Sequence, residues 1–393
     1  MWIGNFFVAA SATMIMPFLS LYIETFGNYS DSYVQRWAGL VFAAAFVTAF
    51  FISPLWGRFG DRHGYKKILL ITGTGIAVSI FLMGYVTTVE QLFLLRLFMG
   101  AVTGFIPTSL AFISAQTPKE IAGKTLGTLQ MGNVSGSLFG PLLGGLLADA
   151  VGFTYTFVIT ATVILCAVAL VAFGIKEIRP NEAGAKNKKY SRKEVLVHIF
   201  RNPVLLTVMF ISFLIQTANF SVQPLLALYV TQLSDSSNIV FLAGFAFSAT
   251  GFGNLLFTRQ WGKLGDRVGH EKILTVLMVA ASIMFIPQAL VTELWQLVLA
   301  RFLFGMAVGG LIPCMTAYIR QVAPLSMQGE VQGYNVSFRF LGNVIGPVTG
   351  GVISGFFGIS SVFFLTSGIF LLGAIILWLS IIRHSEKTEQ RAA

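Results

Sequence analysis

The sequence predicts an all-α membrane protein with twelve transmembrane helices arranged as two pseudo-symmetric six-helix bundles. Three observations carry this prediction: an apolar composition, twelve apolar stretches of membrane-spanning length, and an internal repeat. Of the 393 residues, 55% are hydrophobic and only 11% are charged, and the mean hydropathy is +0.78. A water-soluble fold of this length could not hide so much apolar surface. The 40 glycines fit a helical bundle in lipid, where small residues let helix backbones approach closely.

The twelve apolar stretches each approach the roughly 20 residues that an α-helix needs to cross a bilayer. We expect the spans at 2–26, 36–57, 67–87, 91–114, 122–148, 154–175, 203–230, 239–258, 272–290, 294–318, 330–355 and 360–382. The first stretch has no basic leader and no small-residue cleavage site, so we interpret it as a span and not as a signal peptide. Because it begins abruptly at Met1-Trp2, we expect the native start to lie a few residues upstream.

The basic residues predict the orientation. Lys and Arg gather in alternate loops, and the exceptions among the 26 are Arg36, Arg96, Arg301 and Arg339. Because basic residues accumulate on the cytoplasmic side of a membrane, these loops and both termini are expected to face the cytoplasm. The net charge of +10 follows from this topology, so it gives no reason to expect nucleic acid as a partner.

A repeat divides the chain into two halves. The segment Trp56–Leu69 recurs as Trp261–Leu274, and the segment Gly136–Gly145 recurs as Gly342–Gly351. A parallel six-span repeat is typical of secondary transporters that bind substrate near the membrane midplane, between the halves. The predicted domains are an N-terminal bundle at 1–175, a cytoplasmic linker at 176–202, a C-terminal bundle at 203–382 and a cytoplasmic tail at 383–393.

The first repeated motif lies in the loop between the second and third spans. It contains an acid, two glycines suited to a tight turn and a cluster of cations: Gly57, Asp61, Arg62, Gly64, Lys66 and Lys67. An acid here can interact with the positive end of a neighbouring helix, which is worth about 0.3 to 1 kcal/mol when exposed. We therefore expect these residues, with Asp266 of the second copy, to form a latch that opens and closes. The alternative is a solvated turn whose cations only set the topology.

The second motif lies in the fifth span and consists of Gly136, Gly140, Pro141, Gly144 and Gly145. Its glycines allow close helix packing, and its proline removes a backbone donor and can kink the helix. We expect this span to rock and so to take part in conformational gating.

These motifs resemble those of a known family. The loop motif resembles the signature loop of the major facilitator superfamily, and the span-5 motif resembles the one that marks its drug:proton antiporters. The segment Leu95–Gly100 is similar to the family's third motif, whose arginine, here Arg96, is implicated in proton coupling. The resemblance covers the whole chain, and Met16–Glu24 and Trp37–Phe42 look particularly like the MdtG-like bacterial multidrug exporters.

The resemblance implies the major facilitator fold and a multi-pass location in the bacterial cell (inner) membrane. It implies secondary active efflux of small amphipathic compounds, antibiotics among them, by alternating access and in exchange for protons. A monomer in the lipid bilayer, with the proton gradient as energy source and no cofactor or metal, is the expected form.

The sequence departs from the family in its acids. No carboxylate lies deep in any span, whereas several relatives keep one in the middle of the first. Glu24, near the outer end of span 1, is the nearest substitute, while Asp149 at the outer end of span 5 is expected to be solvated. We expect Glu24 to carry the proton and Arg96 to set its proton affinity, because a change in burial and neighbours can load and release a proton. The alternative is that Glu24 serves only topology.

The expected substrate cavity combines polar and apolar side chains. The polar ones are Gln216, Asn219 and Gln223 on one face of span 7, Gln130 and Asn133 in span 5, and the cations Arg301 and Arg339 within apolar stretches. Arg339 falls near the midplane and should bias the cavity toward neutral, zwitterionic or anionic compounds. Met14, Phe18 and Phe105 could form adaptable apolar walls. Interhelical hydrogen bonding and ordinary core packing are the alternatives for these residues.

Two other functions stay open. One is export or uptake of a specific metabolite such as a sugar. The other is a membrane enzyme or sensor, for which the sequence offers little: no nucleophile, base or metal cluster accompanies its four histidines, His63, His198, His270 and His384. Cys166 and Cys314 show no metal-site spacing. No phosphate-binding Gly-Lys-Ser/Thr loop is present, so ATP is not the expected energy source.

Overall fold

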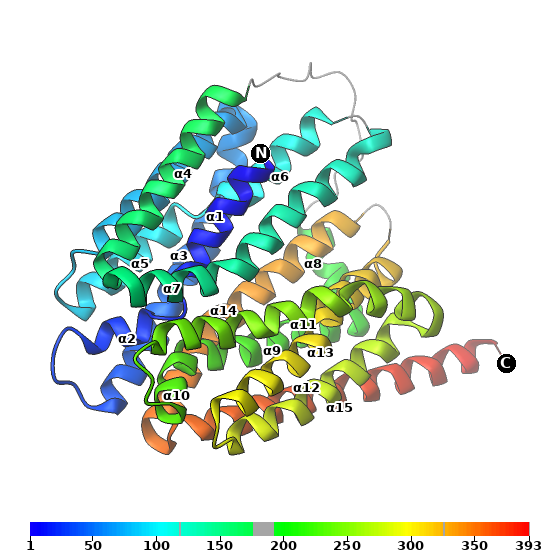
Figure 1. Ribbon diagram of the computed structural model, residues 1–393. Coiled ribbons are helices and arrows are strands. Elements are labelled where there is room, and N and C mark those ends of the chain that lie inside the picture. Colours follow the sequence, from blue (N-terminus) through cyan, green and yellow to red (C-terminus); the bar gives the residue numbers. More distant parts are fainter. Residues whose placement is uncertain (118, 176–191, 325–326, 393) are drawn as a thin grey trace. The chain divides into compact units, whose positions relative to one another are not determined.

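The computed structural model describes residues 1–117, 119–175, 192–324 and 327–392, and within these ranges it is built from helices with no β-strand (Figure 1). The helices of the first half are α1 (Trp2–Met14), α2 (Leu19–Glu24), α3 (Asp31–His63), α4 (Tyr65–Met83), α5 (Val89–Ala101), α6 (Phe105–Gln116) and α7 (Lys119–Gly174). They are followed by α8 (Arg192–Arg201), α9 (Pro203–Val222), the 3₁₀ turn η1 (Gln223–Leu225), α10 (Leu226–Leu233), α11 (Ile239–Val268), α12 (His270–Leu290), α13 (Leu294–Val322), α14 (Gln328–Phe357) and α15 (Ile359–Ala392). The predicted all-helical membrane fold is confirmed.

Ten helical stretches in the described part of the chain are long and apolar enough to cross a membrane, against twelve predicted spans. Spans 5 and 6 are merged in α7, where Gly152 has a φ of 81° and marks the corner between them. Span 1 is divided into α1 and α2, each too short to cross alone. Pro17, in the turn between them, has no backbone N–H with which to continue a helix. The two differences account for the lower number.

Spans 4 and 7 are also interrupted. In span 4, α5 ends at Ala101 and α6 begins at Phe105. In span 7, α9 ends at Val222 and the turn η1 begins at Gln223, next to Pro224. Gln223, predicted to share a face with Gln216 and Asn219, begins a turn of different pitch, so its place on that face stays a prediction.

The internal repeat is present in the backbone and in its hydrogen bonds. The positive-φ glycines of the described residues form two repeat pairs, with Gly64 (98°) matching Gly269 (109°) and Gly152 (81°) matching Gly358 (81°). Trp56 Nε1 donates to the carbonyl of Ala101 over 2.8 Å. Its counterpart Trp261 Nε1 donates to the carbonyl of Met306 over 2.7 Å. The two halves thus repeat the same local architecture.

The chain forms two compact units. The first contains Met1–Ala183 and Gln223–Ser248, and the second contains Gly184–Val222 and Ala249–Ala393. The first unit therefore includes η1, α10 and the start of α11, which the sequence assigned to the C-terminal bundle. Of the predicted linker, 176–191 lies outside the described residues and Arg192–Arg201 forms α8.

Aromatic side chains fill both cores. In the first unit, the ring of Phe18 lies 5.4 Å from those of Phe153 and Phe157. In the second unit, the ring of Phe285 lies 4.4 Å from Phe304 and 5.8 Å from Phe370. These clusters hold the helices whose faces carry the candidate functional residues.

Candidate functional site

The loop motif of the first unit joins α3 to α4 at Gly64. Lys66 Nζ donates to the carbonyl of Ile175 over 2.6 Å, just beyond the end of α7, where the helix dipole favours a cation. Lys67 is exposed. The surroundings of Gly57 and the side chains of Asp61 and Arg62 are not described in the structure, so the latch expected at Asp61 stays a prediction.

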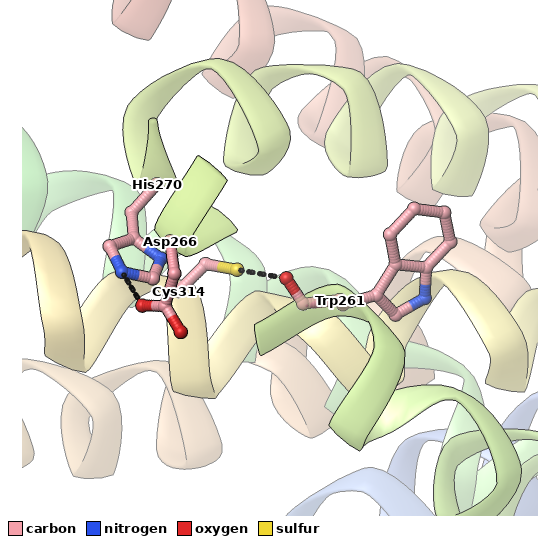
Figure 2. A network of polar contacts seen from close by, with 4 residues as sticks. All are labelled: Trp261, Asp266, His270 and Cys314. Atoms are coloured by element: carbon pink, nitrogen blue, oxygen red, sulfur yellow. Dashed lines mark hydrogen bonds and ion pairs between the residues drawn. The ribbon is translucent and has the colours of Figure 1, made fainter. Parts of the chain in front are cut away.

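The second copy of this loop has a buried imidazole. His270 stands where the first copy has Tyr65, and its Nε2 lies 3.2 Å from Asp266 Oδ1. Its Nδ1 is buried and has no hydrogen-bond partner in the described ranges of the chain, while the Asp266 side chain is 74% exposed. Figure 2 shows the two side chains turned toward each other beside Cys314, whose sulfur lies 3.9 Å from the carbonyl oxygen of Trp261. The sequence alone did not indicate a partner for His270, although His270 and Tyr65 occupy matching positions of the repeat.

The span-5 motif packs α7 against α1. Gly136, Gly140 and Gly144 approach α1 so closely that a Cβ on any of them would overlap its backbone. In the second unit, Gly342, Gly346 and Gly350 of α14 make the same approach to α9. The close packing expected of these glycines is present, and the role of the motif in gating stays a prediction.

The other face of the same motif meets the start of α11. A Cβ on Gly145 would overlap the backbone at Val240, and a Cβ on Gly244 would overlap the carbonyl of Pro141. Asp149, one turn after Gly145, is half-buried and accepts two backbone N–H groups of α11. The expectation of a solvated Asp149 is therefore wrong, because the glycines bring α11 within reach of its carboxylate.

Arg96 is buried in α5, with 4% of its surface exposed. Its Nε donates to the carbonyl of Val41 over 3.2 Å, and its guanidinium lies 5.9 Å from the ring centroid of Phe42. Glu24 ends α2 with an exposed side chain. Within the described part of the chain Arg96 forms no ion pair, so this conformation does not bring Glu24 and Arg96 together, and their joint role in coupling stays a prediction.

The predicted apolar walls lie inside the core of the first unit. Met14, Phe18 and Phe105 are all buried, which fits core packing in this conformation. In span 5, Gln130 is exposed and Asn133 is half-buried. Their contribution to a substrate path remains an expectation.

Arg301 is the repeat counterpart of Arg96 in the second unit, and the two share burial and an aromatic neighbour. Arg301 lies in α13 with its guanidinium 6.0 Å from the ring centroid of Phe304. Unlike Arg96 Nε, Arg301 Nε has no hydrogen-bond partner among the described residues, and the same is true of the buried Nε of Arg339 on α14.

A pocket of the second unit gathers several polar side chains from α9, α13 and α14. Its polar lining consists of Ser212, Gln216, Thr316, Asn335 and Arg339, and four apolar residues of α9 and α13 complete it. The Nε2 of Gln216 donates to Asn343 Oδ1 over 2.9 Å, which ties α9 to α14 beside the pocket. Of the residues predicted for the cavity, Gln216 and Arg339 meet here, and half-buried Asn219 is not part of the lining.

Sequence reasoning did not single out Ser212 and Asn335. Both are small polar residues within apolar stretches, where such residues commonly form interhelical hydrogen bonds. Asn335 lies one helical turn before Arg339 on α14, and this spacing was the signal that could have found it.

Buried cations, tightly packed glycine helices and a polar pocket within repeated bundles are typical of a membrane transporter. A family model described as Major Facilitator Superfamily matches residues 1–252 and 240–393. The chain belongs to the Major Facilitator Superfamily. It is a multi-pass membrane transporter and not an enzyme.

The relatives and structural neighbours belong to this class. The chain is 64% identical to the "Uncharacterized MFS-type transporter YuxJ" of Bacillus subtilis (strain 168), covering 96% of this chain and 97% of the relative. It is 40% identical to the "Multidrug resistance protein MdtG" of Salmonella arizonae, covering 99% and 96%. Among solved structures, the D-xylose-proton symporter superposes with a TM-score of 0.78 at 16% identity, covering 96% and 95%. The symporter shares the fold.

Proposed function

We propose that this protein exports small amphipathic compounds, drugs among them, across the bacterial cytoplasmic membrane in exchange for protons, with both termini in the cytoplasm. The observation that carries the proposal is the 40% identity to the multidrug resistance protein MdtG over nearly the full length of both chains. The span-5 glycine motif and the buried arginines Arg96 and Arg301 support it.

The pocket in the second unit also supports a small-molecule substrate. Ligand sites combine apolar walls with a few placed polar groups, and this pocket has both. Alternating access would expose such a site first to one side of the membrane and then to the other.

The test uses inside-out membrane vesicles from cells that overproduce the protein, energised by respiration. A fluorescent amphipathic dye should accumulate in these vesicles faster than in vesicles without the protein, and an uncoupler should abolish the difference. A growth-inhibition panel on the overproducing strain then ranks candidate drugs. Dye uptake that is independent of the protein or insensitive to the uncoupler contradicts proton-driven drug export.

A further inference from the structure

Three residues that line the pocket of the second unit each carry a buried polar atom without a partner. Ser212 Oγ, Asn335 Oδ1 and Arg339 Nε form no hydrogen bond within the described part of the chain. Ser212 and Asn335 are each only 2% exposed. Buried polar groups are normally hydrogen-bonded, so such atoms around one open space indicate that their partners come from a bound molecule or from water.

The hydrogen-bonding types of these atoms restrict the molecule. Arg339 Nε can only donate, Asn335 Oδ1 can only accept, and the hydroxyl of Ser212 can do either. A matching ligand must therefore present an acceptor to the guanidinium and a donor to the asparagine oxygen. Carboxylates fit a guanidinium particularly well because they accept two parallel hydrogen bonds.

The charge of the pocket further restricts which ligands it can bind. Arg339 stays protonated in proteins, and no acidic residue lines the pocket. The nearest acid along α14 is Glu330, whose position nine residues earlier puts it about 13 Å away along the helix axis. Inside a low-dielectric bundle, an unbalanced cation attracts anions and repels cations more strongly than it would in water.

The rest of the lining suits an apolar tail. Ile215, Leu311 and Met315 lie beside the polar atoms. The space is narrow, with room for about one water molecule. The unbranched and adaptable side chain of Met315 can shift to admit a larger group.

We propose that this pocket binds the anionic head group of an amphipathic substrate, with Arg339 holding a carboxylate or a similar oxyanion and with Asn335 and Ser212 holding an adjacent donor. This rests on the proposed function, because it names the substrate class of that transporter. It assigns Ser212 and Asn335 as specificity-determining residues beside Arg339.

The test compares three probes that share one tail: N-octanoylglycine (anionic), N-octanoylglycinamide (neutral) and octanoylcholine (cationic). Binding to the purified full-length protein in lipid nanodiscs is measured by titration calorimetry. Wild type should bind the anion at least about tenfold more tightly than the amide and should bind the cation most weakly. Equal affinities of wild type for the anion and the amide overturn the proposal.

Variants locate the preference. Arg339→Gln should bind the anionic and the neutral probe with equal affinity, whereas Arg339→Lys should keep part of the preference for the anion. Asn335→Asp should bind the anionic probe more weakly and the cationic probe more tightly than wild type does. The control is Arg320→Gln, which removes the same charge from an exposed residue on α13. This variant should bind the three probes as wild type does. Thermal unfolding shows which variants are folded. An anion preference that survives in folded Arg339→Gln, or that disappears in Arg320→Gln, contradicts the site.

The failures of the two proposals are distinguishable. If the vesicles export a cationic dye in an uncoupler-sensitive way but the binding experiment shows no preference for the anionic probe, the pocket assignment is contradicted and drug export is supported. If the protein in nanodiscs prefers the anionic probe but the vesicles show no uphill transport, the pocket assignment is supported and proton-driven export is contradicted.

Discussion

Asp149 holds the N-terminus of α11 through Phe241: its Oδ2 accepts the backbone N–H of Phe241 over 2.7 Å, and its Oδ1 accepts that of Val240 over 3.3 Å. The first N–H groups of a helix have no partner within the helix, and a carboxylate beside them also interacts favourably with the helix dipole. All three residues belong to the first unit. The carboxylate thus connects the end of the span-5 motif to the start of the eighth predicted span.

We predict that Asp149→Ala weakens the start of α11, whereas Asp149→Asn largely preserves it, because asparagine also accepts hydrogen bonds as a helix cap. Loss of such a cap costs about 1 kcal/mol. Hydrogen exchange at the amides of Val240 and Phe241 should be several-fold faster in the alanine variant. Asp235→Ala, which removes an exposed acid just before α11, is the control. Unchanged exchange in Asp149→Ala would show that the two hydrogen bonds contribute nothing to the stability of this helix end.

The sequence was sufficient for the parts of the fold that depend on local pattern. Apolar stretches placed the helices, and the repeated glycines anticipated the paired turns at Gly64 and Gly269. The interruptions within the spans were harder to predict from the sequence, because a proline does not always break a helix. Pro141, Pro287, Pro313 and Pro347 lie inside continuous helices, since surrounding helices can satisfy the freed backbone groups. Pro17 and Pro224 instead accompany breaks.

The candidate site was only partly predictable for a different reason. Arg339 was evident because a cation in an apolar stretch is costly. Ser212 could not be predicted as a site residue, because it lines the pocket with Asn335 only through the packing of α9 on α14. Asp149 was misjudged in the same way, since its partners on α11 lie far away in the sequence.

We predict that Gly140→Ala destabilises the protein, whereas Gly127→Ala on the same helix does not. A Cβ on Gly140 would overlap the backbone of Ala10 and the hydroxyl of Thr13, while a Cβ on Gly127 would meet open space. Overpacking of this kind costs about 1 to 3 kcal/mol, and alanine in an open helical position is neutral or stabilising. Thermal unfolding in detergent should give a lower midpoint for Gly140→Ala alone. Equal midpoints for the two variants would refute close packing as the role of this glycine.

A third prediction concerns the paired loops: Asp61→Asn should impair transport more than Asp266→Asn. The first loop continues with Lys66 and Lys67, and Lys66 already reaches the end of α7. The second loop instead has Glu271 before Lys272, and its exposed acid pairs with His270. If one of the two loops contributes more to the latch, we therefore expect it to be the first loop, which is the more basic.

Initial rates of dye export, normalised to the amount of each variant in the membrane, provide the measurement for this asymmetry. Lys67→Gln, which removes an exposed cation of the first loop, shows how much the charge cluster contributes by itself. Equal rates for the two aspartate variants at equal abundance would eliminate the proposed difference between the loops.

The last prediction concerns energy coupling, for which we expect Glu24 to carry the proton and Arg96 to set its proton affinity. A proton antiporter needs a group whose protonation changes during the cycle, and a carboxylate that alternates between water and a buried cation is suited to this. In the present conformation Glu24 is exposed at the end of α2, and Arg96 is buried with no carboxylate partner among the residues that the structure describes. The prediction therefore requires the two to approach each other in another state.

In reconstituted vesicles, Glu24→Gln should lose proton-driven uphill transport but keep substrate binding and downhill flux. Glu90→Gln, which neutralises an exposed acid in the first turn of α5, should keep all three activities. Normal uphill transport by Glu24→Gln would move the assignment to Asp149, whose carboxylate lies at the start of α11, or to Asp61.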